Sequence, residues 1–225
     1  MISGIIHAHS IFSDDSLITI ETISKFIHKK GLGFFVLTDH DSIAGSLALK
    51  EHINRLGIPT EIPLAAEYRT EWGELIGAFL AEEIHSRTVD QFIQEVHAQG
   101  GLVLLPHPFV GHVSIERLAE KVDIIEVFNS RCSSAQNQLS YQLAYRFNKP
   151  MYCGSDAHLP WDLANVVVGI DSKLGLREAL IKNGLVPINC EFTVRGGIRL
   201  SQAVKMVRQR DLGPAFKKIN SLFKV

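Results

Sequence analysis

The stretch Gly4-Ile5-Ile6-His7-Ala8-His9, with the Ser13-Asp14 pair that follows it, decides how the rest of this chain is interpreted. A short apolar run leads directly into two histidines one residue apart, and an acid follows within one loop. Side chains at positions i and i+2 of a strand point the same way, so His7 and His9 can converge at the end of a strand. Imidazole pairs of this kind bind zinc, manganese or iron, and carboxylates complete the ligand set. The stretch therefore predicts a strand that ends in a metal site.

The overall composition is that of an ordinary globular protein. The 225 residues are 46% hydrophobic and 21% charged, with a formal net charge of −1, which favours one compact domain with a sizeable core. No global field would draw nucleic acid or an anionic membrane to such a chain, and its apolar runs are far shorter than the roughly 18 residues of a membrane span. The first residues carry no signal-peptide pattern, and three widely spaced cysteines suit a reducing compartment. We therefore expect a cytoplasmic protein.

Short apolar runs alternate with segments of helical period from residue 4 to about residue 190. The expected strands are residues 5–6, 34–37, 62–65, 75–80, 102–105, 124–128, 151–153 and 166–170. The expected helices are at about 20–30, 42–56, 88–99, 114–121, 134–147 and 174–182. Fully apolar strands that alternate with amphipathic helices predict an α/β domain with a parallel sheet covered by helices.

The composition changes after this region. Residues 195–225 hold eight basic residues against one acid, so this segment is near +7 and the rest of the chain is near −8. We therefore divide the chain into a domain at 1–190 and a basic, helical C-terminal extension at 191–225. The extension could guide an oligonucleotide, since phosphate contacts dominate such affinity. The alternative, which we favour, is an amphipathic helix that packs Leu200, Val204 and Val207 on the domain and turns its charges outward.

Polar side chains of the ligand type follow the expected strands. The residues in such places are His7, His9, His40, Glu67, His107, Asp156 and His158. Parallel α/β enzymes build their sites at the carboxyl ends of strands. A single histidine there is commonly structural, but five of the ten histidines together with Asp14, Glu67 and Asp156 favour a metal site. The other histidines lie in or beside helical patterns and are expected at the surface, except His112, whose loop could overhang the pocket.

Taken in order, these motifs resemble the PHP (polymerase and histidinol phosphatase) superfamily. The matching pieces are His7-x-His9 with Ser13-Asp14, Thr38-Asp39-His40, Ala66-Glu67, Pro106-His107-Pro108 and Gly154-Ser155-Asp156-Ala157-His158. The resemblance runs from residue 5 to about 170. It implies a distorted (β/α)7 TIM-like barrel that holds two or three divalent metal ions, usually manganese, iron or zinc, and hydrolyses phosphoesters.

The resemblance also implies a ligand set. One metal would take His7, His9, Glu67 and Asp156; a second would share Glu67 and take His107; a third would take Asp14, His40 and His158. Many members have a histidine where this chain has Glu74. A carboxylate there can still bind a metal and favours a harder ion such as manganese or iron, or it could mean a weaker second site.

The resemblance leads to a hypothesis for the chemistry. Two ions about 3.5–4 Å apart would activate a water for attack on phosphorus, with Glu67 as the bridge and Asp156 beside it. Arg131 is the candidate phosphate clamp, because a guanidinium binds two oxygens at once; the alternative for Arg131 is a surface ion pair. We expect Asp39 and Asp41 to orient His40 or cap a helix, and Cys132 to be a bystander.

Three functions stay open at this level. The first is a phosphoesterase acting on a phosphorylated small molecule, a nucleotide or a short oligonucleotide. The second is an amide or lactone hydrolase. Such enzymes often carry a lysine on a strand, and no lysine lies at the C-terminal end of an expected strand here, which argues against this function. The third is a catalytically silent metal-binding or scaffold module. Loss of metal ligands would indicate such a module, whereas nearly all ligand positions are filled in this chain. We therefore expect the protein to be an enzyme, a metal-dependent phosphoric ester hydrolase.

Overall fold

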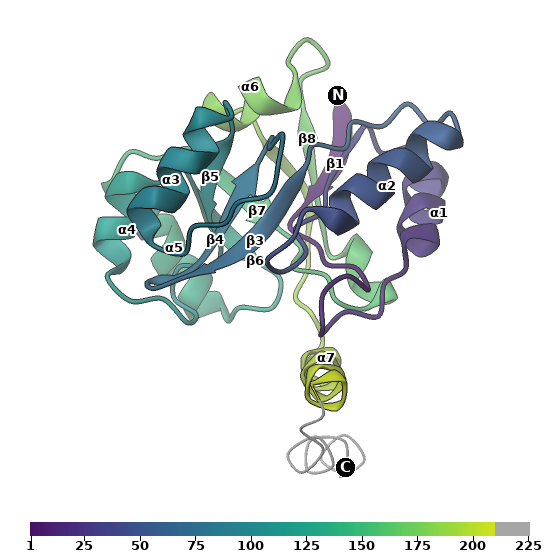
Figure 1. Cartoon of the computed structure of the whole chain (residues 1–225). Coiled ribbons are helices and arrows are strands. Elements are labelled where there is room, and N and C mark those ends of the chain that lie inside the picture. Colours follow the sequence, from purple (N-terminus) through teal and green to yellow (C-terminus); the bar gives the residue numbers. More distant parts are fainter. Residues whose placement is uncertain (210–225) are drawn as a thin grey trace.

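The computed structural model describes residues 1–209 and shows a mixed α/β fold (Figure 1). Residues 210–225, which belong to the expected C-terminal extension, lie outside the described part. The elements in chain order are β1 (Ile2–Ile6), α1 (Ile20–Lys30), β2 (Phe34–Val36), α2 (Ala44–Arg55), β3 (Ala65–Thr70), β4 (Gly73–Ala78), α3 (Val89–Ala98), β5 (Leu102–Leu105), α4 (Ile115–Lys121), β6 (Ile124–Asn129), α5 (Ser134–Arg146), β7 (Met151–Gly154), the 3-10 helix η1 (Pro160–Ala164), β8 (Val166–Ile170), α6 (Leu176–Ile181), β9 (Val186–Cys190) and α7 (Arg195–Arg208).

The strands form two sheets. One has the order β2-β1-β8-β9 and the other the order β3-β4-β5-β6-β7. The pairs β1–β2, β5–β6 and β6–β7 are parallel, whereas β1–β8, β8–β9, β3–β4 and β4–β5 are antiparallel. The expectation of a parallel sheet is therefore wrong for much of the fold, and no closed barrel is found among the described strands.

A tight hairpin explains much of this difference. Only Glu71 and Trp72 separate β3 from β4, and a two-residue connection can join only antiparallel neighbours, since a parallel crossover needs a dozen residues or more. Gly73 closes the turn with φ of 123°, a conformation that glycine adopts without strain. The strand expected at 62–65 is in fact displaced toward the C-terminus, so that Glu67 lies inside β3 rather than after a strand.

Isolated bridges join the two sheets at one end. Ala8 pairs with Ala157, and His40 pairs with Glu67, both in the parallel sense. The amide of Asp156 donates a hydrogen bond to the carbonyl of His7 at 2.6 Å. Residues that follow β1, β2 and β7 are thereby brought to one place, next to β3 of the other sheet.

Helices cover the outer faces of both sheets, and the hydrophobic core accordingly has three parts (Figure 1). Residues of both sheets, such as Ile6, Ile76 and Tyr152, form the part between the sheets. The second part lies under α3, α4 and α5, and the third under α1 and α2, where Ile27 and Leu49 are fully buried. Burial of this apolar surface holds the two sheets together and so stabilises the end at which they are bridged.

Capping residues mark where several helices begin and end. Thr19 accepts a hydrogen bond from the amide of Thr22 at the start of α1, and Gly31 ends that helix with φ of 60°, as capping preferences predict. Thr88, before α3, makes no side-chain bond to the helix backbone; its hydroxyl donates instead to the Gln91 side chain. A capping box is present at Ser133, at the start of α5.

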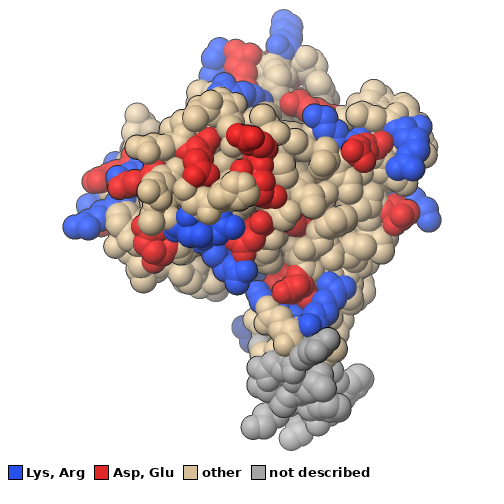
Figure 2. Space-filling model, viewed as in Figure 1, with Lys and Arg blue, Asp and Glu red and all other residues tan. Residues whose placement is uncertain are grey.

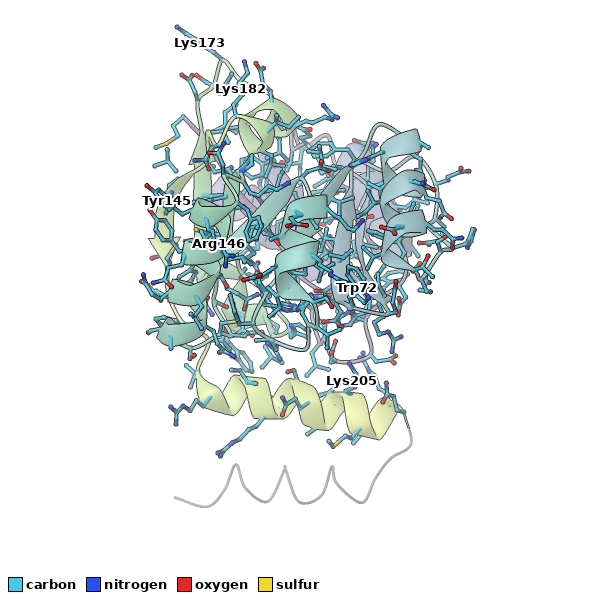
Figure 3. All side chains as sticks on the ribbon, turned by 90° about the vertical axis from the view of Figure 1, so that its left-hand side faces the viewer. Trp72, Tyr145, Arg146, Lys173, Lys182 and Lys205 are labelled. Carbon is cyan, nitrogen blue, oxygen red and sulfur yellow. The ribbon has the colours of Figure 1, made fainter. Side chains whose placement is uncertain are left out.

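The basic segment contributes α7, which lies along the lower side of the molecule in Figures 1 and 3. Its buried residues are Gly197, Ser201 and Ala203, whereas Val207, which we expected to pack, is 46% exposed. The helix is instead held in part by polar contacts, such as those of Ser201 with Arg131 and of Arg208 with the carbonyl of Ser13. On the face shown in Figure 2, acidic and basic side chains of the described residues are interspersed. None of the helices in residues 1–209 is long and apolar enough to cross a membrane.

Candidate metal centre

Glu67 lies at the centre of a buried group of imidazoles. Its Oε1 is 3.0 Å from His107 Nε2 and 3.6 Å from His7 Nε2. Its Oε2 is 3.4 Å from His9 Nε2 and 3.3 Å from His40 Nδ1. The side chain of Glu67 is 1% exposed. Each oxygen of one carboxylate therefore faces a different pair of histidines, an arrangement suited to a ligand that bridges two cations.

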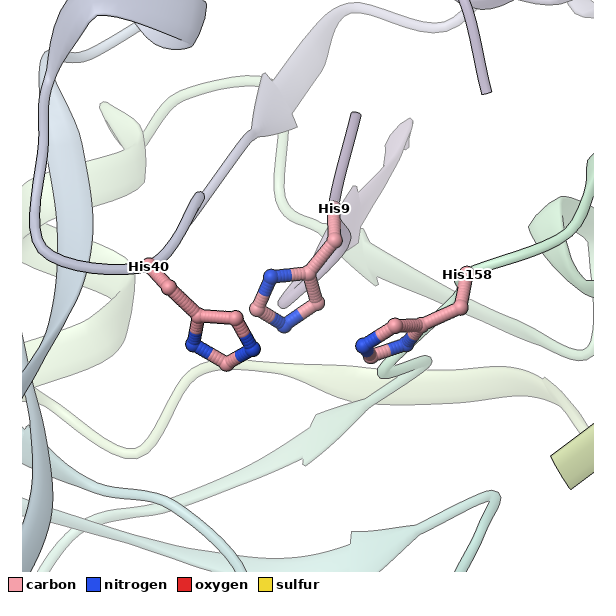
Figure 4. A group of neighbouring side chains, drawn as sticks. All are labelled: His9, His40 and His158. Carbon is pink, nitrogen blue, oxygen red and sulfur yellow. The ribbon is translucent and has the colours of Figure 1, made fainter. Parts of the chain in front are cut away.

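Asp156, which follows β7 at the opposite edge of the same five-stranded sheet, faces the same group. Its Oδ1 lies 3.6 Å from His7 Nε2, 3.5 Å from His9 Nε2 and 3.3 Å from His158 Nδ1. Asp156 has φ of 48°, which is uncommon for a residue with a side chain and is held here by its backbone bond to His7. The rings of His9, His40 and His158 point toward one another (Figure 4), and one nitrogen of each lies within 4.8 Å of the others.

The structure places Asp15, and not Asp14, beside His40 and His158. Asp15 Oδ2 lies 3.3 Å from His40 Nε2, and its Oδ1 lies 3.3 Å from His158 Nε2. Asp14 is exposed and accepts a hydrogen bond from Gln209. The expectation that Asp14 joins His40 and His158 is thus corrected by one position, because the loop after His9 turns the second of the two acids inward.

Glu74 is also brought to the group. It lies in β4 opposite Arg69 of β3, and its Oε2 is 3.8 Å from His107 Nε2. Ligand-type atoms of His40, Glu67 and Glu74 lie within 4.8 Å of one another. The position that we singled out as a departure from the family pattern therefore presents a carboxylate to the same cluster.

A residue that the sequence analysis missed, Glu126, orients His7. Its Oε1 lies 2.9 Å from His7 Nδ1, and its Oε2 accepts from the amide of His107 at 2.6 Å and from Asn129 Nδ2 at 2.9 Å. Because a carboxylate accepts the proton on Nδ1, the Nε2 lone pair of His7 is left to face Glu67 and Asp156. An acid within an otherwise apolar strand is the signal that could have revealed Glu126.

Asp39 plays the corresponding part for His9, through Ser13. Asp39 accepts hydrogen bonds from the Ser13 hydroxyl at 2.7 Å and from the amide and hydroxyl of Ser10. Since the Ser13 hydroxyl proton is committed to Asp39, its oxygen accepts from His9 Nδ1 at 3.2 Å. The Nε2 lone pair of His9 then faces the cluster. Asp41 holds Arg69 instead, so neither acid contacts the His40 ring as we had expected.

Burial and close carboxylates shift the pKa values of the cluster in opposite directions. Burial alone would lower the pKa of His40, but hydrogen bonds with Asp15 and Glu67 raise it to about 11. The pKa of His107 is raised to about 9, because Glu67 outweighs the effect of burial. Burial and the neighbouring His158 and His40 lower the pKa of His9 to about 3. The pKa of Glu67 is held well below its usual range, since the imidazoles of His7, His107 and His40 outweigh its desolvation.

The donor set fits divalent metal ions. Several buried ligand-type atoms have no hydrogen-bond partner among the described residues, and they are His7 Nε2, His9 Nε2, Asp15 Oδ1, His40 Nδ1 and His107 Nδ1. Buried polar atoms are normally paired, and the unpaired atoms here include the two Nε2 atoms that face Glu67 and Asp156. Imidazole nitrogens mixed with carboxylate oxygens suit zinc, iron or manganese.

Arg131 lies at the edge of the cluster, in a cavity of about 660 Å³. Its Nε is 3.8 Å from Asp156 Oδ2, its Nη2 donates to Ser201 Oγ at 3.0 Å, and its buried Nη1 has no partner among residues 1–209. It is therefore not a surface ion pair. Beside it, burial raises the pKa of the Cys132 thiol, which disfavours a nucleophilic thiolate.

Comparison with known proteins agrees with this geometry. A family model described as PHP-associated matches residues 134–183. An uncharacterized protein of Methanocaldococcus jannaschii is 34% identical over 175 residues, which span 72% of this chain and 68% of that protein. A second uncharacterized protein of the same organism is 32% identical over 120 residues, which span 52% of this chain and 69% of that protein.

Solved structures of similar fold include a two-domain protein and two other bacterial proteins. A two-domain protein of Bacteroides vulgatus, containing a predicted PHP-like metal-dependent phosphoesterase, has a TM-score of 0.69 at 18% identity, covering 84% of this chain and 65% of that one. A candidate metal-dependent phosphoesterase of Bifidobacterium adolescentis has a TM-score of 0.55 at 17% identity, with 69% and 87% covered. An amidohydrolase of Chromobacterium violaceum with bound sulfate and no metal has a TM-score of 0.58 at 16% identity, with 82% and 97% covered.

These findings define a protein with a PHP-like α/β fold and a cluster of histidines and carboxylates where its two sheets meet. The match to the PHP-associated model and the shared fold support membership of the PHP superfamily. At these identities the solved structures establish the fold alone, and this chain spans less than two thirds of the Bacteroides vulgatus protein.

Proposed function

We propose that this chain is a metal-dependent phosphoesterase that hydrolyses a phosphorylated small molecule, a nucleotide or a short oligonucleotide. One observation supports this most strongly. The two oxygens of Glu67 face two separate pairs of imidazoles, at 3.0–3.6 Å, which is the donor arrangement that a bridged pair of divalent ions requires.

The residues that would hold the metal ions fall into three groups. His7, His9, Glu67 and Asp156 form the first, and His107 with Glu67 and Glu74 forms the second. The third consists of His40, His158 and Asp15, which takes the place that we first gave to Asp14. Two or three ions of manganese, iron or zinc would supply Lewis-acid catalysis to phosphoester hydrolysis when bound. Carboxylates at Asp15 and Glu74 favour manganese or iron.

The protein's own side chains prepare the site for such a substrate. Glu126 and the Asp39–Ser13 pair fix the tautomers of His7 and His9, so that both Nε2 lone pairs point inward. Arg131 lines the cavity, and its Nη1 has no partner among the described residues; a guanidinium there can bind two phosphoryl oxygens and neutralise their charge. Glu67 and Asp156 come from opposite edges of the five-stranded sheet, and both face His7 and His9, which follow β1 of the other sheet.

Two finer features are part of the proposal. We infer that the two sheets are the halves of an open, distorted barrel, because the bridges Ala8–Ala157 and His40–Glu67 join them at the site. A cytoplasmic location is supported by three cysteines that are free, although the thiols of Cys153 and Cys190 are close enough to hydrogen-bond.

The test combines metal analysis with a substrate screen. Purified protein is analysed for manganese, iron and zinc and assayed with p-nitrophenyl phosphate, bis-p-nitrophenyl phosphate, nucleotides, short oligonucleotides and a p-nitroanilide. Two or three metal equivalents with turnover of a phosphoester support the proposal. Metal without any turnover favours a scaffold module, and turnover of the anilide alone favours an amidohydrolase.

A further inference from the structure

Helix α7 lies across the open side of the metal cluster. The cavity of about 660 Å³ has ligand-type residues such as Glu67 and His107 on one wall. The facing wall is supplied by α7, through Ile198, Gln202, Lys205 and Met206. Figure 3 shows the helix running along the lower side of the body, with Lys205 directed toward it. Any substrate that reaches the cluster through this cavity therefore touches α7.

The helix is attached to the loops of the site itself. Arg208 Nη1 donates to the carbonyls of Ser13 and Ser16 at 2.9 and 3.0 Å, which lie on either side of Asp15. In the middle of the helix, the fully buried Ser201 accepts a hydrogen bond from Arg131. Near its start, a Cβ atom at Gly197 would lie 3.3 Å from Leu159, so the helix and the loop after β7 are in close contact. α7 is thus held at three points along its length.

Two cations meet the cluster from this wall. Lys205 Nζ lies 3.3 Å from Asp15 Oδ2, and Arg131 Nε lies 3.8 Å from Asp156 Oδ2. Ser201, where Arg131 docks, is four residues before Lys205 and so lies on the same face of α7, about 6 Å away along the axis. The two cations therefore reach the cluster at positions one helical turn apart along α7, each beside a different carboxylate of the cluster.

We propose that α7 is the substrate-binding wall of this site, and that Lys205 and Arg131 together form a two-cation clamp for a terminal phosphoryl group. This inference rests on the proposed phosphoesterase function and narrows its substrate to a phosphomonoester. A monoester dianion offers three non-bridging oxygens and two charges, which two cations in addition to metal ions can bind. A diester offers two such oxygens and one charge, and therefore gains less from the second cation.

The alternative role of Lys205 is an ion pair that only steadies Asp15. Lys205 is 40% exposed, and exposed pairs contribute little to stability. The two roles differ in what they predict. A clamp residue changes the affinity for phosphate and the KM of a monoester, whereas a purely structural pair changes folding stability or metal content.

The experiment compares Lys205→Ala with Arg199→Ala as a matched control. Arg199 is a cation on the same helix, is exposed, and forms no ion pair with any residue in 1–209. Lys205→Arg tests whether charge at this position is sufficient. For manganese-loaded protein of each variant, binding of inorganic phosphate is measured by calorimetry, and KM and kcat are measured with p-nitrophenyl phosphate and its bis ester. Metal content and circular dichroism are recorded for each variant.

We expect Lys205→Ala to raise the Kd of phosphate and the KM of the monoester about tenfold, the loss of one charge-assisted hydrogen bond. Its kcat should change by less than about threefold, and the KM of the diester should rise clearly less than that of the monoester. Lys205→Arg should recover most of the loss, and Arg199→Ala should match the wild type.

Each other outcome decides against part of the inference. Equal behaviour of Lys205→Ala and Arg199→Ala overturns the clamp, as does a loss of phosphate affinity that is matched by loss of metal. An equal rise in KM for both esters overturns the assignment to monoesters. If the wild type turns over no ester, the proposed function fails, and the phosphate titration alone then decides whether Lys205 binds phosphate.

Discussion

Replacing Asp15 by asparagine should remove one metal subsite, whereas the same replacement at Asp14 should not. The oxygens of Asp15 lie 3.3 Å from His40 Nε2, His158 Nε2 and Lys205 Nζ, and the residue is 8% exposed. Asp14 points to the surface. The two acids are adjacent in sequence and chemically identical, so each variant is the control for the other.

The expected magnitude follows from these contacts. Loss of a residue that only orients a ligand costs metal sites about 10–100-fold in affinity. Removing the charge of a direct ligand should therefore cost at least about 100-fold, or about 2.7 kcal/mol. Without metal, Asp15→Asn should lower the free energy of unfolding by about 1.5–3 kcal/mol, the value of a hydrogen bond to a charged group. Asp14→Asn, with a single hydrogen bond from Gln209 at 3.2 Å, should stay within about 0.5 kcal/mol of the wild type.

Calorimetric titration with manganese, supported by elemental analysis, measures both variants. Asp15→Asn should bind one metal equivalent fewer than the wild type, because among the described residues Asp15 makes no ion pair with His7 or His107, which belong to the other subsites. Its circular dichroism should stay unchanged. Asp14→Asn should bind metal as the wild type does. Equal losses in the two variants, or a loss confined to Asp14→Asn, would refute the placement of Asp15 in the site.

Three further predictions concern the bridge, the orientation of a ligand and the packing beneath the site. Glu67→Gln should abolish phosphoester turnover and lower bound metal, because the bridging charge is lost; full metal content with full activity would exclude the bridging role. Glu126→Gln should weaken manganese binding about 10–100-fold through its bond to His7, measured by calorimetry against the exposed control Glu120→Gln, and equal affinities would count against it. Gly45→Ala should cost about 1–3 kcal/mol in urea unfolding, because the added Cβ would lie 1.8 Å from Asp39 Oδ2; the control Gly196→Ala, at the same position of another helix, meets nothing within 4 Å, and equal stabilities would contradict the clash.

The sequence alone was informative where a feature depends on near neighbours. The helix expected at about 20–30 coincides with α1, and its isoleucines, among them Ile23 and Ile27, form the buried face. The apolar residues 102–105 predict β5, and His107 directly after them is predicted near a site. Capping, helical period and apolar runs are local properties, so a single chain segment carries the whole signal. The ordered motifs then indicated the PHP superfamily.

Tertiary structure decided which of these residues meet. Asp39 holds Ser10 and Ser13 from 29 and 26 residues away, and that contact turns Asp15 rather than Asp14 toward His40. Glu126 lies 119 residues from His7, and Lys205 lies 190 residues from Asp15; nothing local to any of them signals its partner. The β3–β4 hairpin likewise makes the five-stranded sheet mixed, and the antiparallel pairing of β8 with β1 makes the other sheet mixed. The reason is that periodicity records which face of an element is apolar, whereas the choice between adjacent acids and the partner of a buried charge depend on hydrogen bonds between distant segments, which exist only once the chain has folded.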